Sequence, residues 1–367
     1  MIENAIDIFK THYDLGDVIE AKELTGGYNN HSFALTTRRN DHQVRYVVRR
    51  YNPRTAEKEV KFEHALVNHL CDNGFDLAAG ILPATGGDTY VKEKQTTAGQ
   101  TTVIYWAVFE YLQGEERYTW TDTDIAPDDL TSAARVLARL HQAGSNFRKP
   151  PGADRVQPAI MDFLPTFGET YAQYAQKAAK TEFDQLFQEQ KDNILEAVDK
   201  AILPVSDRKK LPWLPIHCDF HQGNMKYKNS EVTGLFDFDW SKIDLRVFDV
   251  GLALVYFCAR WEGRTAGSLD LDQCELFLKT YNQAWTPHFD TGPVSRLEKQ
   301  YLPAMLAAGN LFVLHWTIFD YYTLESWVTS AVFSGRMPDV ELYMKFLNHG
   351  LNLMNWIEDR KATLAGL

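Results

Sequence analysis

The sequence predicts an α+β protein with two lobes: a small N-terminal lobe with an antiparallel sheet and a helix, and a larger, mainly helical C-terminal lobe. Its 367 residues exceed the size at which a single hydrophobic core usually stops growing. Alternating apolar runs, typical of strands, recur as far as Leu112, and helical periodicity dominates beyond Gly114. We therefore divide the chain into residues 1–113 and residues 114–367.

The composition is that of an ordinary folded protein and argues against some partners. The formal net charge of -11 disfavours nucleic acid, because phosphate backbones attract basic surfaces, and it favours a neutral or cationic substrate. Residues 1–20 contain no continuous apolar core, and the apolar run 251–259 is far too short to cross a bilayer. We therefore expect a cytoplasmic protein with no membrane partner. A homodimer stays open.

The cysteines indicate free thiols rather than a disulfide framework or a zinc site. None of them shows Cys-x-x-Cys spacing, and free thiols are the usual state in a reducing cytoplasm. The four positions are Cys71, Cys218, Cys258 and Cys274.

The first elements of the N-terminal lobe are a helix and a hairpin. Residues 2–13 show the spacing of a short amphipathic helix. Residues 24–35 contain Gly26-Gly27 followed by an alternating run, which predicts a hairpin. Backbone N–H groups at such a turn can hold phosphate oxygens, although a bare Gly-Gly pair is more often simply a turn.

A strand and a helix follow, and both carry charged residues. Residues 44–51 predict a strand on which Arg49 and Arg50 face opposite sides. Residues 55–73 predict a helix, with Glu59 and Glu63 one turn apart. Either glutamate could reach a cation on the strand, while solvated side chains are the commoner alternative. Short strands fill residues 75–112.

The C-terminal lobe is predicted to be mostly helical. Residues 130–142 predict one helix, and residues 162–200 predict two helices on its outside. Residues 302–327 form an unusually aromatic helical segment, which is more often part of a core than a ligand site.

The most informative stretch, residues 214–252, places polar groups at turns between short apolar runs. Residues 217–224 read as a loop, residues 225–228 as a strand, and residues 232–238 as a returning strand. This arrangement displays the side chains of Asp219, Asn224, Asp237 and Asp239.

These side chains match the needs of phosphoryl transfer. The reaction requires a carboxylate that deprotonates an acceptor hydroxyl and oxygen ligands for Mg²⁺. Asp219 could take the proton, and Asn224 could turn its carbonyl oxygen toward a metal. Asp237 is the strongest metal-ligand candidate, with Asp239 as a supplement at a second ion.

The spacing and order of these motifs resemble a known superfamily. The motifs are His217-x-Asp219-x4-Asn224, residues 236–239 (FDFD), residues 248–251 (FDVG) and the Leu-x-x-Leu-His sequence at residues 137–141. Together they resemble the aminoglycoside phosphotransferase, choline kinase and homoserine kinase superfamily. The order and spacing of segments along the chain most resemble its homoserine-kinase-like branch. The resemblance implies a protein-kinase-like two-lobed fold, ATP and Mg²⁺ as cofactors, and a small-molecule hydroxyl as the acceptor.

The resemblance also implies roles for the residues of the central stretch. Asp219 would be the catalytic base, and Asn224 and Asp237 would hold magnesium. Asp249 would brace the catalytic loop, and His217 would be a structural hydrogen-bonding residue.

In the N-terminal lobe the resemblance implies a nucleotide site. Arg49 falls where many relatives carry a phosphate-binding lysine, with Glu63 as its helix partner, and a guanidinium can grip phosphate oxygens in a bidentate manner. Residues 110–112 resemble the hinge strand that meets adenine. The residues expected to contact the nucleotide are Gly26, Gly27, Asn30, Ser32, Arg49, Glu63, Glu110 and Leu112.

Two other functions remain as alternatives. A metal-dependent hydrolase could use His217, Asp219 and His221 with Asp237 and Asp239. A catalytically silent nucleotide-binding module is the other alternative.

The acceptor itself stays open among an amino alcohol, an amino acid such as homoserine, and a sugar. Candidate walls for it, each of which is more often a packing or surface residue, are Asp244, Asp320, Trp261, Trp316 and Tyr321.

Overall fold

The structure is a computed structural model that describes residues 1–367 except 25–29, 98–99, 123, 178, 287–290 and 329–338. The chain forms two compact units that alternate along the sequence. The first comprises residues 1–116, 146–156 and 225–241, and the second comprises residues 117–145, 157–224 and 242–367. Each unit is described separately below.

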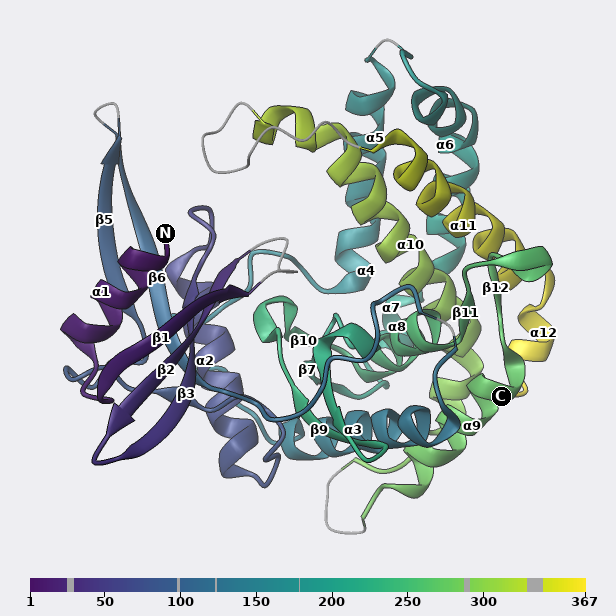
Figure 1. The fold of residues 1–367 in the computed structure, drawn as a ribbon. Coiled ribbons are helices and arrows are strands. Elements are labelled where there is room, and N and C mark those ends of the chain that lie inside the picture. Colours follow the sequence, from purple (N-terminus) through teal and green to yellow (C-terminus); the bar gives the residue numbers. More distant parts are fainter. Residues whose placement is uncertain (25–29, 98–99, 123, 178, 287–290, 329–338) are drawn as a thin grey trace. The chain divides into compact units, whose positions relative to one another are not determined.

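The first unit is built on an antiparallel sheet with the order β1-β2-β3-β6-β4, in which β5 also pairs with β6 (Figure 1). This sheet confirms the predicted α+β class with an antiparallel N-terminal sheet. The strands are β1 (Asp17–Leu24), β2 (His31–Arg39), β3 (His42–Arg50), β4 (Ile81–Leu82), β5 (Val91–Thr97) and β6 (Gln100–Glu110).

Alternation along the strands gives the sheet two apolar faces, each covered by a helix. Phe9 of α1 (Ile2–His12) packs in a cluster with Phe33 and Trp106 on one face. Val60 of α2 (Glu57–Asp72) packs with Tyr51 on the other face. Successive side chains of a strand point to opposite faces, so the strand that buries Val48 under α1 directs Arg49 toward α2.

A second hairpin completes this unit. Strands β8 (Met225–Lys228) and β9 (Glu231–Leu235) are joined at Asn229 and Ser230, whose φ angles of 50° and 61° are those of a type I′ turn. The hairpin joins the rest of the unit through a bridge between Glu115 and Tyr227. A short 3-10 helix, η3 (Phe238–Trp240), follows it.

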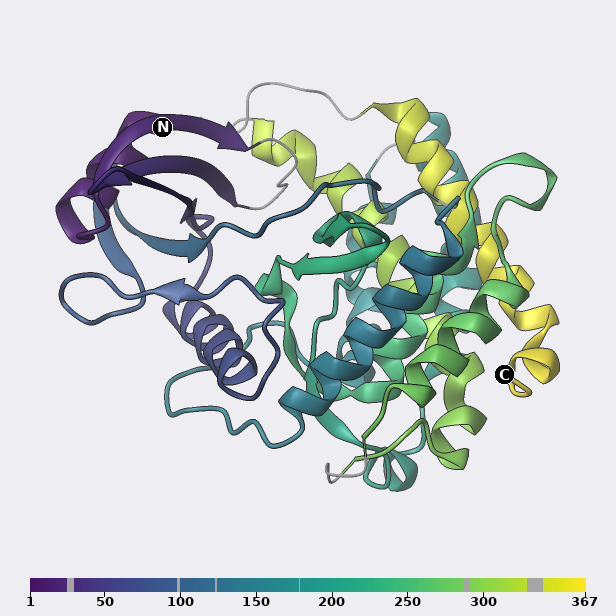
Figure 2. The same ribbon diagram turned by 60° about the horizontal axis from the view of Figure 1, so that its bottom comes forward.

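The second unit is mainly helical, as predicted, and Figure 2 shows α3 and α9 side by side within it. Its two-stranded pairs are β7 (Trp213–Ile216) with β10 (Lys242–Leu245), and β11 (Ala259–Arg260) with β12 (Ser268–Leu269). The helices are α3 (Pro127–Gly144), α4 (Ile160–Phe163), η1 (Leu164–Thr166), α5 (Phe167–Ala175), α6 (Glu182–Ala201), α7 (Val205–Arg208), η2 (Gln222–Asn224), α8 (Arg246–Cys258), η4 (Gly263–Thr265), α9 (Leu271–Gln283), α10 (Arg296–Val328), α11 (Val340–Asp359) and α12 (Lys361–Leu364).

Helix α8 is the centre of the second unit, and all of its residues are buried. It packs closely against α10 because Gly251 lies on the contact. A Cβ atom at Gly251 would come within 2.9 Å of the Met305 backbone carbonyl. Any larger residue would therefore push the two helices apart.

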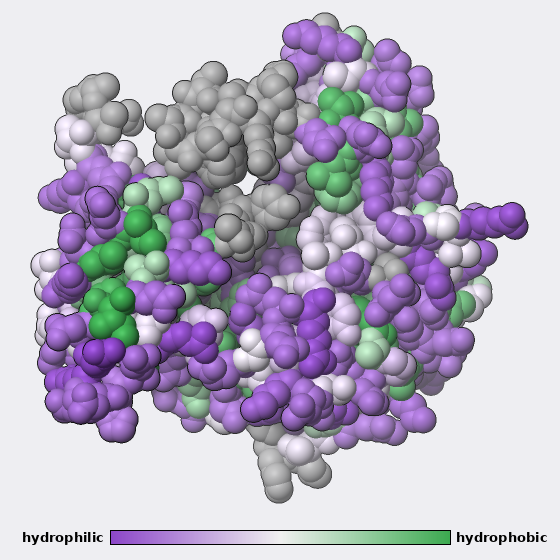
Figure 3. Space-filling model, viewed as in Figure 1, coloured by the Kyte–Doolittle hydropathy of each residue, from purple (hydrophilic) through white to green (hydrophobic). Residues whose placement is uncertain are grey.

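Helix α10 is the one helix among the described residues that is long and apolar enough to cross a membrane. Its apolar part spans Arg296–Thr323, and 72% of its most apolar window is buried inside the protein. This burial confirms the interpretation of the aromatic segment as core. The surface seen in Figure 3 is mostly hydrophilic, with apolar residues confined to small patches.

Candidate active site

The loop that follows β7 has an unusual backbone, held by one buried carboxylate. Cys218 has a φ of 63°, a left-handed conformation that costs free energy in a residue other than glycine. Its N–H donates to Asp249 Oδ1 at 2.9 Å, and the N–H of His217 donates to Asp249 Oδ2 at 3.1 Å. Asp249 thereby fixes the turn that presents Asp219.

Asp249 is itself oriented by a buried chain of hydrogen bonds. His141 on α3 donates from Nε2 to Asp249 Oδ2 at 3.0 Å, and the Tyr281 hydroxyl donates to His141 Nδ1 at 2.7 Å. Burial lowers the pKa of His141 despite the nearby Asp249 carboxylate, so the ring is neutral at pH 7. The Leu-x-x-Leu-His sequence thus supplies the histidine that fixes the carboxylate under the loop.

Asp219 accepts hydrogen bonds at both carboxylate oxygens. The Tyr256 hydroxyl donates to Oδ1 at 3.2 Å, and Asn224 Nδ2 donates to Oδ2 at 3.0 Å. His221 Nε2 lies 3.6 Å from Oδ2. Burial alone would raise the pKa of Asp219, but His221, His217 and Asn224 outweigh it, and the net pKa is lowered. Asp219 is therefore an ionised carboxylate at neutral pH.

The orientation of the Asn224 amide suits a metal ligand. Its Nδ2 donates to both the Asp219 backbone carbonyl at 2.9 Å and the Asp219 carboxylate. Only the NH₂ end of the amide can donate, so the Oδ1 end points away from Asp219. Amide and carboxylate oxygens are ligands that Mg²⁺ accepts, and the donor chemistry of Asn224 fits that ion.

Two residues of this cluster were missed in the sequence. Gln222 Nε2 donates to the backbone carbonyls of Trp120 at 3.3 Å and Asp122 at 2.8 Å, so it anchors the loop to a distant segment. Tyr256 lies two helical turns after Asp249 on α8 and therefore shares its face. That spacing was the available signal for Tyr256, whereas nothing local indicated Gln222.

The first unit contains a separate cluster around Arg49. Its Nη1 donates to Glu63 Oε1 at 3.0 Å, and its Nη2 lies 3.4 Å from Asp237 Oδ1. Tyr51 donates to the other oxygen of Glu63 at 2.9 Å. Burial alone would lower the pKa of Arg49, but Asp237 and Glu63 outweigh it and the pKa is raised. The guanidinium is therefore a permanent cation with its direction fixed by α2.

Asp237 and Asp239 are positioned by a local turn. Asp237 has a φ of 69° and precedes η3, which contains Asp239. Asn30 Nδ2 donates to Asp239 Oδ2 at 2.8 Å, while Asn30 Oδ1 accepts from the Asn52 N–H at 3.0 Å. The predicted residues Asn30, Arg49, Glu63, Asp237 and Asp239 therefore lie together in this unit.

The other residues predicted to contact the nucleotide are Gly26, Gly27, Ser32, Glu110 and Leu112. Gly26 and Gly27 lie outside the described residues. Ser32 is paired with Arg49 in the sheet register. The Glu110 N–H donates to the Gly80 carbonyl at 2.8 Å. The Leu112 side chain lies so close to Gly234 that a Cβ atom added to Gly234 would come within 2.9 Å of it.

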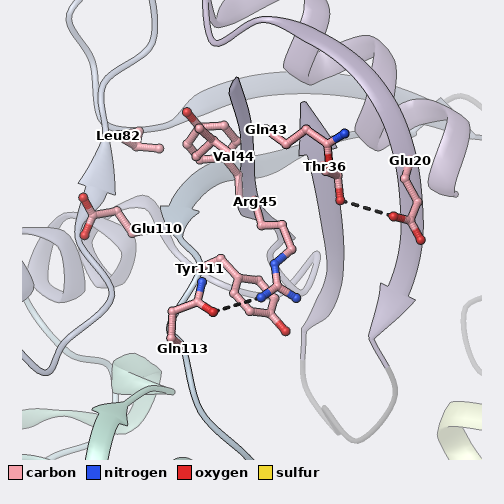
Figure 4. A pocket seen from close by; sticks show the side chains of 10 residues that line it. Glu20, Thr36, Gln43, Val44, Arg45, Leu82, Glu110, Tyr111 and Gln113 are labelled. Atoms are coloured by element: carbon pink, nitrogen blue, oxygen red, sulfur yellow. Dashed lines mark hydrogen bonds between the residues drawn. The ribbon is translucent and has the colours of Figure 1, made fainter. Parts of the chain in front are cut away.

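A pocket of about 760 Å³ lies beside the predicted hinge strand (Figure 4). The Arg45 guanidinium lies 4.0 Å from the centre of the Tyr111 ring and donates to Gln113 Oε1 at 2.9 Å. The cation–π contact and the hydrogen bond tie the hinge to β3. Glu20 and Thr36 line the side of the pocket opposite the hinge.

Comparisons with known proteins show the family of the chain. The sequence profile of the phosphotransferase enzyme family matches residues 20–294, and the chain belongs to that family. It is 27% identical over 312 residues to a homoserine kinase of Paraburkholderia phymatum, covering 81% of this chain and 82% of the relative. It is 26% identical over 306 residues to a homoserine kinase of Polaromonas naphthalenivorans, covering 82% of each chain.

Solved structures share the fold. A microcompartment-associated aminopropanol kinase superposes with a TM-score of 0.64 at 16% identity, covering 100% of this chain and 99% of that one. A choline kinase from Cryptosporidium parvum gives a TM-score of 0.61 at 13% identity, covering 99% and 96%. The chain is therefore a small-molecule kinase with a protein-kinase-like fold.

Proposed function

We propose that this kinase transfers the γ-phosphoryl group of ATP to a hydroxyl group of a small metabolite, with Mg²⁺ as the metal. The observation that carries the proposal is the state of Asp219. It is ionised, it receives donors from Tyr256 and Asn224, and its backbone is fixed through Asp249. These are the properties of a positioned general base.

Asp219 would accept the proton of the acceptor hydroxyl during transfer. The acceptor oxygen forms a bond to the γ-phosphorus while the bond between that phosphorus and the bridging oxygen breaks, and ADP leaves with the electron pair. Asn224 and Asp237 would hold Mg²⁺, with Asp239 at a second ion, and the metal would neutralise charge on the phosphates.

Arg49 would bind the non-transferred phosphates, and Glu63 would hold its guanidinium in place. A fixed guanidinium offers two parallel donors to phosphate oxygens. Asn30, Ser32, Gly26 and Gly27 would border the phosphates. The strand end at Glu110 and Leu112 would meet the adenine.

The hydrolase alternative receives less support. A dinuclear hydrolase needs several side-chain ligands, whereas Mg²⁺ in a kinase uses one or two side chains and the substrate phosphates. The hydrolase also assigns no purpose to the buried Arg49–Glu63 pair. The silent-module alternative assigns no purpose to the oriented Asp219.

We propose a cytoplasmic enzyme, because ATP is abundant there and reduced thiols persist there. All four cysteines are free, and Cys218, Cys258 and Cys274 are buried.

The test is ADP release from Mg-ATP in the presence of homoserine, ethanolamine, choline, hexosamines, methylthioribose and aminoglycosides. The Asp219→Asn variant should bind Mg-ATP and lose turnover by about 10²–10⁴-fold, because it lacks only the base. Unchanged turnover in this variant would contradict the assignment. Release of phosphate from a phosphoester without any nucleotide would instead support the hydrolase.

A further inference from the structure

A buried tyrosine in the first unit contacts the pair formed by Arg49 and Glu63. Tyr51 directly follows β3, and its N–H donates to the Tyr105 carbonyl at 3.0 Å, so the pairing with β6 continues through it. Alternate residues of a strand share a face, and Arg49 and Tyr51 therefore both point toward α2. The Tyr51 hydroxyl donates to Glu63 Oε2 at 2.9 Å, and Arg49 Nη1 donates to Oε1 at 3.0 Å. Each oxygen of the carboxylate thus receives a donor.

The hydrogen bonds continue through His64, the next residue of α2. His64 Nε2 lies 3.0 Å from the Tyr51 hydroxyl oxygen, and His64 Nδ1 lies 2.8 Å from the Thr89 hydroxyl oxygen. The side chains of Tyr51, Glu63 and His64 are buried, whereas Thr89, two residues before β5, is half-buried. A chain of four hydrogen bonds therefore connects Thr89 to the Arg49 guanidinium.

The donors and acceptors give this chain one direction. A phenol has a single hydrogen atom, and because Tyr51 donates it to Glu63, the phenol oxygen can only accept from His64. His64 Nε2 must then carry a proton. Burial, with a smaller contribution from the Arg49 charge, lowers the pKa of His64 to about 3, so the ring is neutral at pH 7 and has one N–H group. Its Nδ1 therefore accepts from the Thr89 hydroxyl.

The surroundings of the chain make each of its hydrogen bonds count. The centre of the Phe109 ring lies 5.0 Å from Arg49 Cζ and 5.9 Å from the centre of the His64 ring. Hydrogen bonds are stronger in such apolar surroundings, and the loss of a partner costs more there than in water. Burial raises the pKa of Glu63, and the Arg49 cation and the Tyr51 hydroxyl act against this rise. The hydroxyl thus helps to keep Glu63 charged beside the guanidinium.

We propose that Tyr51 and His64 are positioning residues for nucleotide binding. His64 donates to Tyr51, and Tyr51 donates to Glu63. The carboxylate, fixed in this way, aims the Arg49 guanidinium at the phosphates. Thr89 sets the tautomer of His64 from the other end of the chain. This inference rests on the proposed role of Arg49 in phosphate binding and adds residues that act through it.

The first readout is the tautomer of His64. Nitrogen NMR of the imidazole rings distinguishes a ring protonated on Nε2 from one protonated on Nδ1, and the His64→Gln variant assigns the signal. We expect the Nε2–H tautomer in the wild type at pH 7. A ring protonated only on Nδ1 would overturn the inference, because His64 could then give no hydrogen bond to Tyr51.

The second readout is the dissociation constant of Mg-ATP, measured by calorimetry without an acceptor. Tyr51→Phe removes only the hydroxyl, and we expect it to weaken Mg-ATP binding about tenfold. The matched control is Tyr105→Phe, because Tyr105 packs in the same cluster as Tyr51 but is outside the chain, and this variant should bind like the wild type. In an Arg49→Ala background, Tyr51→Phe should change the affinity by less than about twofold, because the hydroxyl acts through the guanidinium.

Thr89 provides a second test, which remains available if Tyr51→Phe does not fold. Thr89→Val removes the donor to His64 and should weaken Mg-ATP binding about threefold. Thr89→Ser keeps a hydroxyl group and should restore most of the affinity. Thr85→Val, at an exposed position in the same segment, is the control and should bind like the wild type.

Two results would contradict the inference while leaving the kinase proposal intact. One is an unchanged Mg-ATP affinity in both Tyr51→Phe and Thr89→Val. The other is an equal loss of affinity from Tyr51→Phe in the presence and in the absence of the Arg49 side chain. Failure of the proposed phosphate-binding role gives a different pattern, in which Arg49→Ala binds Mg-ATP as tightly as the wild type.

Discussion

Asn224 Nδ2 donates to Asp219 Oδ2 at 3.0 Å, so the proposed metal ligand directly orients the proposed base. In the proposed mechanism, one side chain would therefore serve both the proton transfer and the metal. The amide would donate hydrogen bonds to Asp219 with its NH₂ end and offer its oxygen to the metal at the other end, and neither a carboxylate nor an apolar residue can do both.

The first prediction concerns this amide. Asn224→Ala removes the Oδ1 ligand and the donors to Asp219, and we expect the Mg²⁺ concentration for half-maximal turnover to rise about 10–100-fold. Asn224→Asp keeps an oxygen ligand but places a second carboxylate beside Asp219, so it should restore metal affinity without restoring turnover. Magnesium titrations of ADP release check both variants. Wild-type magnesium dependence in Asn224→Ala would contradict the assignment.

The second prediction concerns Arg49 and its partner Glu63, 3.0 Å apart. Arg49→Ala removes the cation proposed for the phosphates and should weaken Mg-ATP binding about 10–100-fold, the effect of one or two charge-assisted hydrogen bonds. Arg49→Lys keeps the charge but loses the bidentate geometry, so its affinity for Mg-ATP should lie between those of the wild type and Arg49→Ala. Calorimetry measures the dissociation constants, with exposed Arg38→Ala as the control. Equal affinities for all three proteins would exclude a phosphate-binding role.

Most elements were predictable because their signals are local. The strand at residues 225–228 and the helix at residues 55–73 are confirmed, as β8 and as α2 (Glu57–Asp72). The strand predicted for residues 232–238 is wrong at its end, because β9 stops at Leu235 and Asp237 adopts a left-handed conformation. Apolar and acidic residues alternate from Phe236 to Asp239, as they would in a strand. The tertiary structure that positions the two carboxylates overrides this local preference.

The second unit shows a similar limit. Residues 162–200 were expected to form two helices, whereas the structure has α4, η1, α5 and α6 over this range and its flanks. Pro165 lies at the break between α4 and α5, and Thr181 caps α6 by accepting the N–H of Asp184 at 3.2 Å. Contacts such as Gln222 to Trp120 join residues far apart in sequence, and no local pattern encodes them.

The third prediction concerns the pH dependence set by Asp219. Its pKa is lowered despite burial, chiefly by His221, 3.6 Å away. The acid limb of kcat/KM should therefore lie below the ordinary aspartate value of about 3.9. His221→Ala removes the side chain that does most to lower the Asp219 pKa, so the acid limb should move to higher pH. A pH–rate profile that extends from neutral pH to well below the ordinary aspartate pKa measures this, with the exposed His42→Ala as the control. Superimposable profiles would argue against the electrostatic role of His221.

The fourth prediction concerns stability in acid. His315 on α10 stacks on Phe167 with ring centres 3.9 Å apart, and burial lowers its pKa to about 3. The unfolded chain binds this proton near pH 6.5 and the folded chain does not. The unfolded state therefore holds more protons below pH 6.5, and stability falls as the pH falls.

Protonation of His315 in the unfolded chain alone should lower the free energy of unfolding by about 2 kcal/mol between pH 6.5 and pH 5. His64, whose pKa burial lowers to about 3, adds a loss of the same sign. His315→Phe keeps the stack but cannot take a proton, so its stability should depend less on pH by about 2 kcal/mol over that range. Urea unfolding at the two pH values measures the difference, which is independent of any change in absolute stability. An unchanged pH dependence in His315→Phe would mean that His315 is protonated in the folded state as readily as in the unfolded state.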